Sequence, residues 1–377
     1  MAAHAPSPER GHRLPLLQAL RGLAALLVVY DHLVGMWPRW HHLHWGPAVF
    51  VNRWVFTPLG IMMHGGALGV ALFFLLSGFV ISMAAQRENR WQFFLRRALR
   101  IFPPFWVSVA FIIAMYGLLW TAHAWVGGDW VGRLFTPPGL LVSLDISHLL
   151  ANVSLLNYLL GWPPINGVAW TLIIEALFYL WAGLILPLLQ TRPRAALFLS
   201  WTAIALLQWQ AHAGMHIYLL AANAVYLTFL FLGVCLYFFW AGRIGRWSFV
   251  FASIAFWGLF LHGTAHIVAQ APYTLTGYGV SYGLAWLLFA LLLLVEGRVR
   301  PWAALTRIGD ISYSLYLYHG AAGLVLLSLL TPALGYPIAL ALALIAAVTC
   351  SWLSWRYVER PSQGLARHVT KRLVAAR

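Results

Sequence analysis

Residues 17–34 read LQALRGLAALLVVYDHLV, a stretch that is long and apolar enough for a membrane-spanning helix yet carries Arg21, Asp31 and His32. A bilayer span needs about 20 mainly apolar residues. An arginine at the centre of such a helix costs about 2.5–3.5 kcal/mol, so ionisable side chains normally face the interior of a helix bundle or a wet cavity. This stretch therefore predicts a membrane protein with a polar interior.

The composition extends this prediction to the whole chain. Of its 377 residues, 62% are hydrophobic, 15% are aromatic and only 9% are charged, which excludes an ordinary soluble globular protein. Residues 137–161 are apolar but interrupted by polar residues, and we expect an interfacial or re-entrant pair of short helices there. We expect an all-α, polytopic bundle of about ten transmembrane helices, at residues 16–37, 67–86, 102–122, 168–190, 195–213, 217–240, 248–268, 279–295, 310–330 and 335–356.

The basic residues are distributed unevenly around these windows. With the amino terminus inside the cell, twenty Lys or Arg residues fall in cytoplasmic segments and only Arg39, Arg53 and Arg133 in exterior loops. The positive-inside rule therefore places both termini in the cytoplasm. Anionic headgroups account for the net charge of +15, so we expect no nucleic-acid partner. We expect one transmembrane domain at residues 1–361 and a basic cytoplasmic tail at 362–377.

Two ionisable residues of the first window share a helix face. Arg21 and His32 are eleven positions apart, which in an α-helix is three turns plus about 20°, or roughly 16 Å along the axis. Arg21 alone could instead reach the cytoplasmic headgroups, and His32 could be a neutral core histidine bonded to a neighbouring helix. Asp31 points about 80° away from Arg21, so it would orient a partner or face another wall of the interior.

Two further windows bury single polar groups. GVAWTLIIEALFYLW (167–181) puts Glu175 inside a helix with Tyr179 one turn further on, and a carboxylate there must be protonated or paired. ALGVALFFLLSGFVIS (67–82) contains Ser77 between small residues. Close helix packing is favoured over a nucleophilic role for this serine, because a nucleophile elbow needs a strand, a sharp turn and a helix.

The window near the carboxyl end carries a series of polar residues. IGDISYSLYLYHGA (308–321) places Asp310 at the mouth of a helix and His319 inside it. Ser312, Ser314 and Tyr316 would form a polar seam between them, with helix association as the alternative explanation.

An arginine cluster precedes the third window. FFLRRALRIFPPFW (93–106) makes Arg97 and Arg100 neighbours on a helix, with Arg96 beside them. Such a cluster can grip phosphate through bidentate hydrogen bonds. Plain cytoplasmic topology with headgroup contact is the alternative.

In combination these features resemble the membrane acyltransferase-3 family. The resemblance runs in order from about residue 14 to 361. It implies a ten-helix bundle that moves an acyl group, usually acetyl, from cytoplasmic acyl-coenzyme A to a hydroxyl, commonly of a bacterial surface glycan. The segments that carry it are the Arg21 to His32 spacing, GVALFFLLSGF (69–79), RRALRIFPPFW (96–106), WTLIIEALFYL (170–180), GDISYSLYLYH (309–319) and YVERP (357–361).

The resemblance also implies roles for residues. Arg21 and His32 match the essential pair of the family, Arg97 and Arg100 its donor end, and Glu175 and His319 its polar core. Asp31 departs from the family pattern. We further expect Arg96 and Ser77 at the donor end, and Ser312, Tyr316 and Tyr179 in the polar core.

These residues predict a mechanism. With the phosphates of coenzyme A at the arginine cluster, the pantetheine arm would pass Arg21 and bring the thioester to His32, a general base for the acceptor hydroxyl. Glu175 or Asp31 would hold the imidazole tautomer, and Arg21 would stabilise the oxyanion or the donor arm. An acyl-histidine intermediate is equally compatible with the sequence.

The exterior segments are expected to meet the acceptor. MWPRWHHLHWGPAVF (36–50) is typical of an interfacial aromatic belt. We expect no metal, although a zinc site at His41, His42 and His44 is an alternative. Aromatic faces also suit sugar rings, so a glycan platform would comprise Trp37, Trp40, Trp45, Trp125, Trp130 and Trp162.

The expected partners are acetyl-CoA as acyl donor, a glycan or lipid-linked glycan as acceptor, and the lipids of a bacterial inner membrane. Two other function classes stay open. A secondary transporter would also have about ten spans, but twin broken helices in matched halves are absent from the sequence pattern. A non-catalytic scaffold of an envelope-polysaccharide complex would tolerate the loss of Arg21 and His32.

Overall fold

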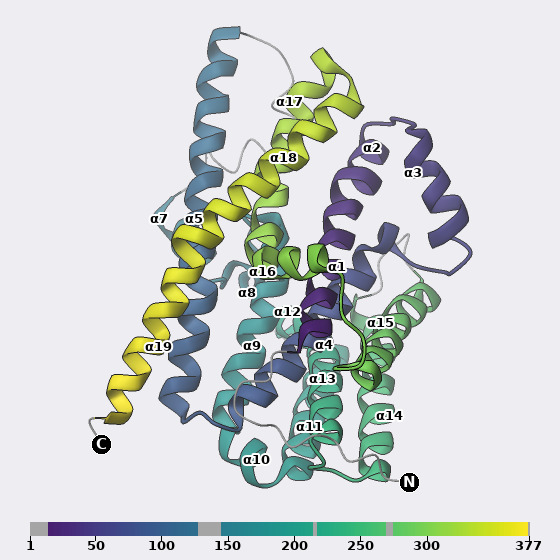
Figure 1. Cartoon of the computed structure of the whole chain (residues 1–377), viewed down its shortest axis with the longest axis vertical. Helices are drawn as coiled ribbons and strands as arrows, with labels where there is room; N and C mark the ends of the chain where they lie inside the picture. The colour runs from purple at the N-terminus through teal and green to yellow at the C-terminus, as the bar shows by residue number, and fades with distance from the viewer. Residues whose placement is uncertain (1–13, 127–144, 214–216, 269–273, 376–377) are drawn as a thin grey trace. The chain divides into compact units, whose positions relative to one another are not determined.

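The structure is a computed structural model that describes residues 14–126, 145–213, 217–268 and 274–375. Every regular element within these ranges is a helix (Figure 1), which confirms the predicted all-α class. Nine helical stretches among the described residues are long and apolar enough to cross a bilayer, so the chain is a multi-pass membrane protein. They are Pro15–Trp40, Met63–Ala85, Arg90–Gly117, Gly167–Leu184, Tyr218–Trp240, Arg246–Val268, Leu275–Val295, Ala303–Leu334 and Tyr336–Lys371.

The helices follow one another with short connections. The amino-terminal half contains α1 (Pro15–Tyr30), η1 (Asp31–Met36), α2 (Trp37–Trp40), α3 (Gly46–Val51), η2 (Asn52–Phe56), η3 (Met63–Gly65), α4 (Gly66–Ala85), α5 (Arg90–Val126), α7 (Ile146–Val153), α8 (Asn157–Leu160), η5 (Gly167–Ala169) and α9 (Trp170–Leu184). The carboxyl-terminal half contains α10 (Leu186–Thr191), α11 (Pro193–His212), α12 (Tyr218–Val225), α13 (Leu227–Trp240), α14 (Arg246–Gly263), η6 (Thr264–Val268), α15 (Leu275–Val295), α16 (Ala303–Tyr318), η7 (His319–Leu324), α17 (Val325–Leu334), α18 (Tyr336–Ser354), η8 (Trp355–Glu359) and α19 (Arg360–Ala375).

The tenth expected span coincides with α11. This helix has 20 residues, which at 1.5 Å per residue is about 30 Å, but it is less apolar than the nine spans. The expected pair of short helices is present as α7 and α8 in the described part of 137–161. Residues 137–144, Arg133 and Trp130 lie outside the described residues, as does the side chain of Trp125.

The chain forms two compact units that interleave along the sequence. The first unit comprises Met1–Val28, Val49–Phe94 and Ile174–Asp310. The second comprises Val29–Ala48, Leu95–Ile173 and Ile311–Arg377. The boundaries fall inside α1, α5, α9 and α16, so single helices contribute to both units.

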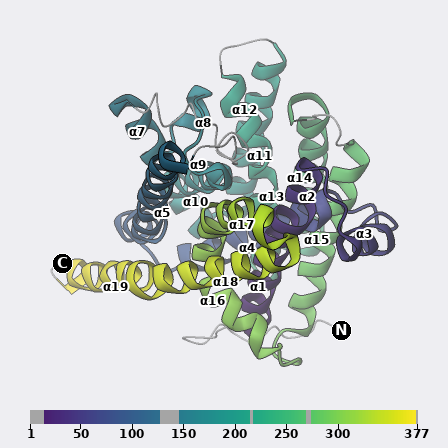
Figure 2. The ribbon, with the colours of Figure 1, turned by 90° about the horizontal axis from the view of Figure 1, so that it is seen from above.

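The first unit is built on a close crossing of α4 and α13, which lie next to each other in both views (Figures 1 and 2). Gly78 on α4 and Gly233 on α13 make the crossing possible, because a Cβ at either position would overlap the backbone of the other helix. Tight van der Waals packing through small residues is the usual way to hold helices together in lipid. Beside this crossing, the rings of Phe229 and Phe260 pack on the Tyr282 ring. Each of their centroids lies 4.7 Å from the centroid of Tyr282.

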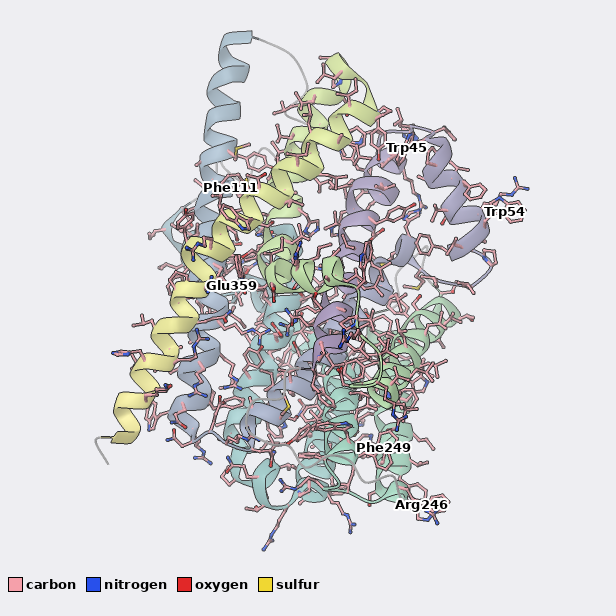
Figure 3. All side chains as sticks on the ribbon, viewed as in Figure 1. Trp45, Trp54, Phe111, Arg246, Phe249 and Glu359 are labelled. Atoms are coloured by element: carbon pink, nitrogen blue, oxygen red, sulfur yellow. The ribbon has the colours of Figure 1, made fainter. Side chains whose placement is uncertain are left out.

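The second unit contains a long carboxyl-terminal helix. The stretch Tyr336–Lys371 is continuously helical through α18, η8 and α19, so residues 362–375 of the expected tail are part of a helix (Figure 1, yellow). Glu359, labelled on this helix in Figure 3, is buried and accepts a hydrogen bond of 2.7 Å from Ser314 of α16. At the far end, Arg96 of α5 donates to the Thr370 hydroxyl at 3.1 Å.

Gly78→Val should destabilise the protein, because overfilling a packed core costs about 1–3 kcal/mol. Gly258→Ala is the matched control: nothing lies within 4 Å of a Cβ added at Gly258 on α14, and alanine is the better helix former by about 1 kcal/mol. Thermal unfolding in detergent, followed by fluorescence-detected size-exclusion chromatography, would measure both. An unchanged midpoint for Gly78→Val would contradict the crossing.

Candidate active site

Two helices change register at the residues that the sequence singled out. The α-helical register of α1 ends at Tyr30 and a π-helix runs over Asp31–Met36, while a second π-helix, His319–Leu324, follows α16. Short π-helical segments are rare and occur frequently at functional sites. The regular α-helix assumed for the Arg21 to His32 spacing therefore stops before His32.

A side chain from another helix donates a hydrogen bond to the first π-helix, and Pro38 explains why. In this register the N–H of Trp37 donates to the carbonyl of His32, five residues back. The next position is Pro38, which has no N–H to donate to the Leu33 carbonyl. The hydroxyl of Tyr336, a buried residue at the start of α18, donates to that carbonyl instead, at 2.8 Å. The widened turn is thus fixed by a side chain from another helix.

The two π-helices bring together two histidines that are 287 positions apart. Nδ1 of His32 lies 2.6 Å from Nε2 of His319, and the two ring planes are within 10° of each other. His319 is completely buried, and its Nδ1 lies 3.0 Å from the Leu315 carbonyl one turn earlier. The sequence predicted His319 as a polar core residue, whereas the structure makes it the direct partner of His32.

The tautomer of both rings follows from the Leu315 carbonyl. A carbonyl only accepts, so Nδ1 of His319 carries the proton and, in the neutral ring, its Nε2 is the acceptor. Nδ1 of His32 must then be the donor, which leaves the lone pair of His32 on Nε2. A histidine whose Nδ1 donates to an acceptor and whose Nε2 bears the lone pair has the tautomer that a general base needs. The partner found at Nδ1 of His32 is His319, whereas the sequence suggested Glu175 or Asp31 for this role.

Further polar contacts lie near His319 in the second unit. The Tyr316 ring centroid lies 5.8 Å from that of His319, and the Tyr316 hydroxyl accepts from Thr171 at 3.0 Å. Asn166 donates to the Ser108 hydroxyl at 3.2 Å and to the Leu317 carbonyl at 3.4 Å.

Sequence reasoning missed Thr171, Asn166 and Ser108. Asn166 offered one signal: it stands directly before η5 in PPINGVAW (163–170) and accepts from the Val168 N–H as the cap of that helix.

Glu175 belongs to a separate polar group in the first unit. Its carboxylate oxygen Oε1 accepts hydrogen bonds from the Ser77 hydroxyl and, at 3.0 Å, from the Tyr179 hydroxyl. The prediction that a carboxylate inside a span must be paired is confirmed, and Tyr179 lies one turn on as expected. Ser77, expected at the donor end, is here a partner of Glu175.

The remaining predicted site residues divide between the units. Arg21 is half-buried in the first unit. Asp310 belongs to the same unit but is exposed, and it accepts a hydrogen bond from Gln18 at 2.9 Å. Asp31 and Ser312 are buried in the second unit. None of Arg21, Asp31 and His32 is exposed, which agrees with their predicted avoidance of lipid. The arginine cluster lies on α5 in the second unit, with Arg97 buried and Arg96 and Arg100 half-buried.

The predicted aromatic segment 36–50 is only partly interior. Trp37 is buried and its indole N–H donates to Ser328 at 3.0 Å, while Trp40 is half-exposed. The ring of His41 stacks on Trp37 at 4.1 Å and its Nδ1 lies 2.9 Å from the Trp37 carbonyl. Among the described residues, no group of three or more His, Cys, Asp or Glu side chains is placed to hold a metal ion.

The described residues thus form a multi-pass helical membrane protein whose second unit contains a hydrogen-bonded pair of histidines. Residues 15–356 match the acyltransferase-3 model, which is described as an acyltransferase domain, and the chain belongs to this family. The resemblance inferred from the motifs is therefore confirmed. The protein is an enzyme that transfers acyl groups to oxygen, an O-acyltransferase.

Curated relatives agree with this assignment. Nodulation protein 10 of Rhizobium leguminosarum bv. viciae is 27% identical over 390 residues, which cover 97% of this chain and 98% of that protein. The exopolysaccharide production protein ExoZ of Rhizobium meliloti (strain 1021) is 30% identical over 323 residues, 81% of this chain and 92% of ExoZ. O-acetyltransferase PaAT-1 of Phomopsis amygdali is 25% identical over 179 residues, 44% of this chain and 32% of that protein. No solved structure matches the chain.

His319→Phe should lower kcat by about 10²-fold or more, because His32 loses the acceptor that fixes its tautomer and general-base catalysis contributes about 10² to 10⁴ in rate. His319→Gln should retain more activity, because its amide oxygen can still accept from Nδ1 of His32. Initial rates of the two purified variants would test this. Equal losses in both variants would contradict the tautomer role.

Proposed function

We propose that this enzyme moves an acetyl group from cytoplasmic acetyl-CoA to a hydroxyl of an exported glycan in the bacterial inner membrane. The observation that carries the proposal is the hydrogen bond between Nδ1 of His32 and Nε2 of His319, which leaves the lone pair of His32 on Nε2. The family supplies acyl transfer. The name O-acetyltransferase of one relative supports acetyl, and the name of ExoZ supports an exopolysaccharide acceptor.

In the proposed reaction His32 acts as a general base. Its Nε2 takes the proton of the acceptor hydroxyl while the oxygen attacks the thioester carbonyl. The tetrahedral intermediate collapses by breaking the carbon–sulfur bond, and the coenzyme A sulfur leaves with the proton from His32. The products are the acetyl ester and free coenzyme A. During the step the imidazolium of His32 keeps its hydrogen bond to the neutral Nε2 of His319.

An acyl-histidine intermediate uses the same lone pair. In that route Nε2 of His32 attacks the thioester first, and the acceptor hydroxyl then takes the acetyl group from the ring. Rapid acid quench of enzyme with labelled acetyl-CoA and no acceptor distinguishes the routes. Label retained on the protein and lost in His32→Ala would favour the covalent route.

Donor binding is assigned to the arginines of α5. Arg96, Arg97 and Arg100 lie in the same unit as the histidine pair, at the helix end that the charge pattern places in the cytoplasm. Guanidinium groups match the phosphates of coenzyme A. Arg21 would stabilise the oxyanion or the pantetheine arm. Asp31, buried next to His32 in the chain, would favour the cationic state of the pair.

The polar group around Glu175 is proposed as a support of the interior. Two hydroxyl donors from different helices hold its carboxylate, so the group joins α4 to α9 inside the membrane. Ser312 and Tyr316 belong to the corresponding seam of α16.

His32→Ala should reduce acetyl transfer to the background rate while the protein stays folded in the membrane, because the base is lost. His44→Ala, at an exposed histidine of the exterior segment, is the matched control and should be active. Acetyl transfer and thioester hydrolysis by purified protein measure the effect. A scaffold or a transporter would show no transfer in the parent protein, and full activity of His32→Ala would remove His32 from the mechanism.

Arg97→Ala should raise KM for acetyl-CoA about 10- to 100-fold, since a charge-assisted hydrogen bond is worth about 1.5–3 kcal/mol. Acetyl-pantetheine lacks the phosphates that the cluster would bind, so its KM should not change. Arg192→Ala, at an exposed arginine before α11, is the control. An equal effect on both donors would show that Arg97 acts on folding and not on phosphate.

In the native cell, deletion of the gene should remove ester-linked acetyl groups from an envelope glycan, and the parent gene should restore them. Mass spectrometry of the glycans before and after mild alkali identifies the esters. Unchanged ester content in every glycan fraction would count against a glycan acceptor.

A further inference from the structure

The short helices α7 and α8 form a hairpin, residues 145–166, that is tied firmly to its own unit. The indole N–H of Trp106 on α5 donates to the Val153 carbonyl at 2.9 Å. Asn152 closes the hairpin, accepting from the Ile165 N–H at 2.7 Å and donating to the Pro163 carbonyl at 3.3 Å. The His148 N–H and the Ser147 hydroxyl donate to Asp145 and hold the pKa of that carboxyl below its usual range.

The hairpin also contacts the helix that carries His319. The Tyr158 hydroxyl donates to the Asn166 carbonyl at 3.0 Å, and burial raises the pKa of Tyr158, so this hydroxyl stays protonated. The side chain of Asn166 donates to the Leu317 carbonyl, two residues before His319. Asn166 therefore ties the hairpin to the helix that ends just before His319, and the positive-inside pattern places the hairpin on the extracytoplasmic side.

Two side chains of this otherwise well-bonded hairpin have unmet hydrogen-bonding atoms. Asn157 is 1% exposed, and neither its amide oxygen nor its amide nitrogen has a hydrogen-bond partner. Nε2 of His148 is likewise buried without a partner. Buried polar groups are nearly always hydrogen-bonded, so each exception needs an explanation.

Trp162 contacts both residues. The His148 ring stacks on the Trp162 ring with centroids 4.8 Å apart, and the backbone N–H of Trp162 donates to the backbone carbonyl of Asn157 at 2.9 Å. Leu156 and Leu160 are about half-exposed, so the one-turn helix α8, which carries Asn157, lies at the surface.

We propose that Asn157, His148 and Trp162 form a subsite for the hydroxyl groups of a sugar-like polyol, occupied when the acceptor enters beneath the hairpin. This proposal rests on the proposed function. A primary amide both donates and accepts, so it can bind two neighbouring hydroxyls of one sugar ring, and Nε2 of His148 can bind a third. The aromatic ring of Trp162 suits the apolar face of the same ring. The hydroxyl groups of the acceptor would thereby supply the hydrogen-bond partners that Asn157 and His148 lack.

The proposal predicts a combination of effects that a structural amide would not give. Leucine has nearly the shape of asparagine but no amide, so Asn157→Leu removes the polar atoms that lack hydrogen-bond partners. Without sugar, this variant should therefore be as stable as the parent protein or more stable. At the same time it should lose the rise in thermal midpoint that methyl α-glucopyranoside gives to the parent protein. His148→Phe keeps the stack on Trp162 and should likewise reduce the sugar-induced shift.

Activity gives an independent measurement. With acetyl-CoA as donor, Asn157→Leu should raise KM for methyl α-glucopyranoside about tenfold or more, the worth of one good hydrogen bond. Transfer to propan-1-ol and hydrolysis of acetyl-CoA should stay at the parent rates. Ser154→Ala, an exposed hydroxyl of the hairpin that bonds only within its own helix, is the control.

The outcomes separate the two proposals. A sugar-induced thermal shift that is lost in Asn157→Leu supports the subsite even if no acetyl is transferred, in which case the proposed function fails alone. The subsite is overturned if the parent shows no shift, if the shift persists in Asn157→Leu, or if that variant loses stability and all activities together.

Discussion

The hydrogen bond between His32 and His319 is the constraint on which the rest of the second unit depends. It requires Nδ1 of His319 to be held by the Leu315 carbonyl, and it requires α1 and α16 to continue as π-helices at the right residues. Gly323 in the second π-helix permits the approach, because a Cβ there would press on the Leu33 side chain at 3.3 Å. The tautomer of the histidine pair thus depends on the backbone register of these two helices.

Two acidic side chains inside the membrane-spanning helices accept hydrogen bonds from hydroxyl groups. Glu175 accepts from Ser77 and Tyr179 in one unit, and Glu359 accepts from Ser314 in the other. A hydroxyl donor satisfies a carboxylate oxygen without a second buried ion. Taking such an ion out of water would cost on the order of several kcal/mol more. The serines and tyrosines that give α4, α9 and α16 their polar seams therefore allow acidic residues to lie within otherwise apolar helices.

Sequence patterns predicted what depends on local periodicity and hydropathy. Nine of the ten expected spans, the short hairpin and the placement of Tyr179 one turn from Glu175 are of this kind, and they are present among the described residues. The partnership of His32 with His319 was not predicted, because it depends on how two helices far apart in the chain meet. The π-helix that begins at Asp31 was not predicted either. The structure shows that the Leu33 carbonyl accepts from the Tyr336 hydroxyl, because Pro38 has no N–H to donate to it. The hydropathy pattern also predicted a span at α11. The glutamines and tryptophans of this helix make it less apolar than the nine spans.

A neutral partner for the base suits a reaction inside a membrane. A carboxylate on Nδ1 of His32 would place a permanent charge in a region of low dielectric, where an isolated ion is costly. His319 is uncharged in the resting pair, so a positive charge arises only while His32 holds the proton of the acceptor. The thioester of the proposed donor is an activated acyl group, and its sulfur takes that proton away on leaving. In the proposed reaction the pair would therefore bear charge only while His32 holds the proton, and buried Asp31 stands next to His32 in the chain.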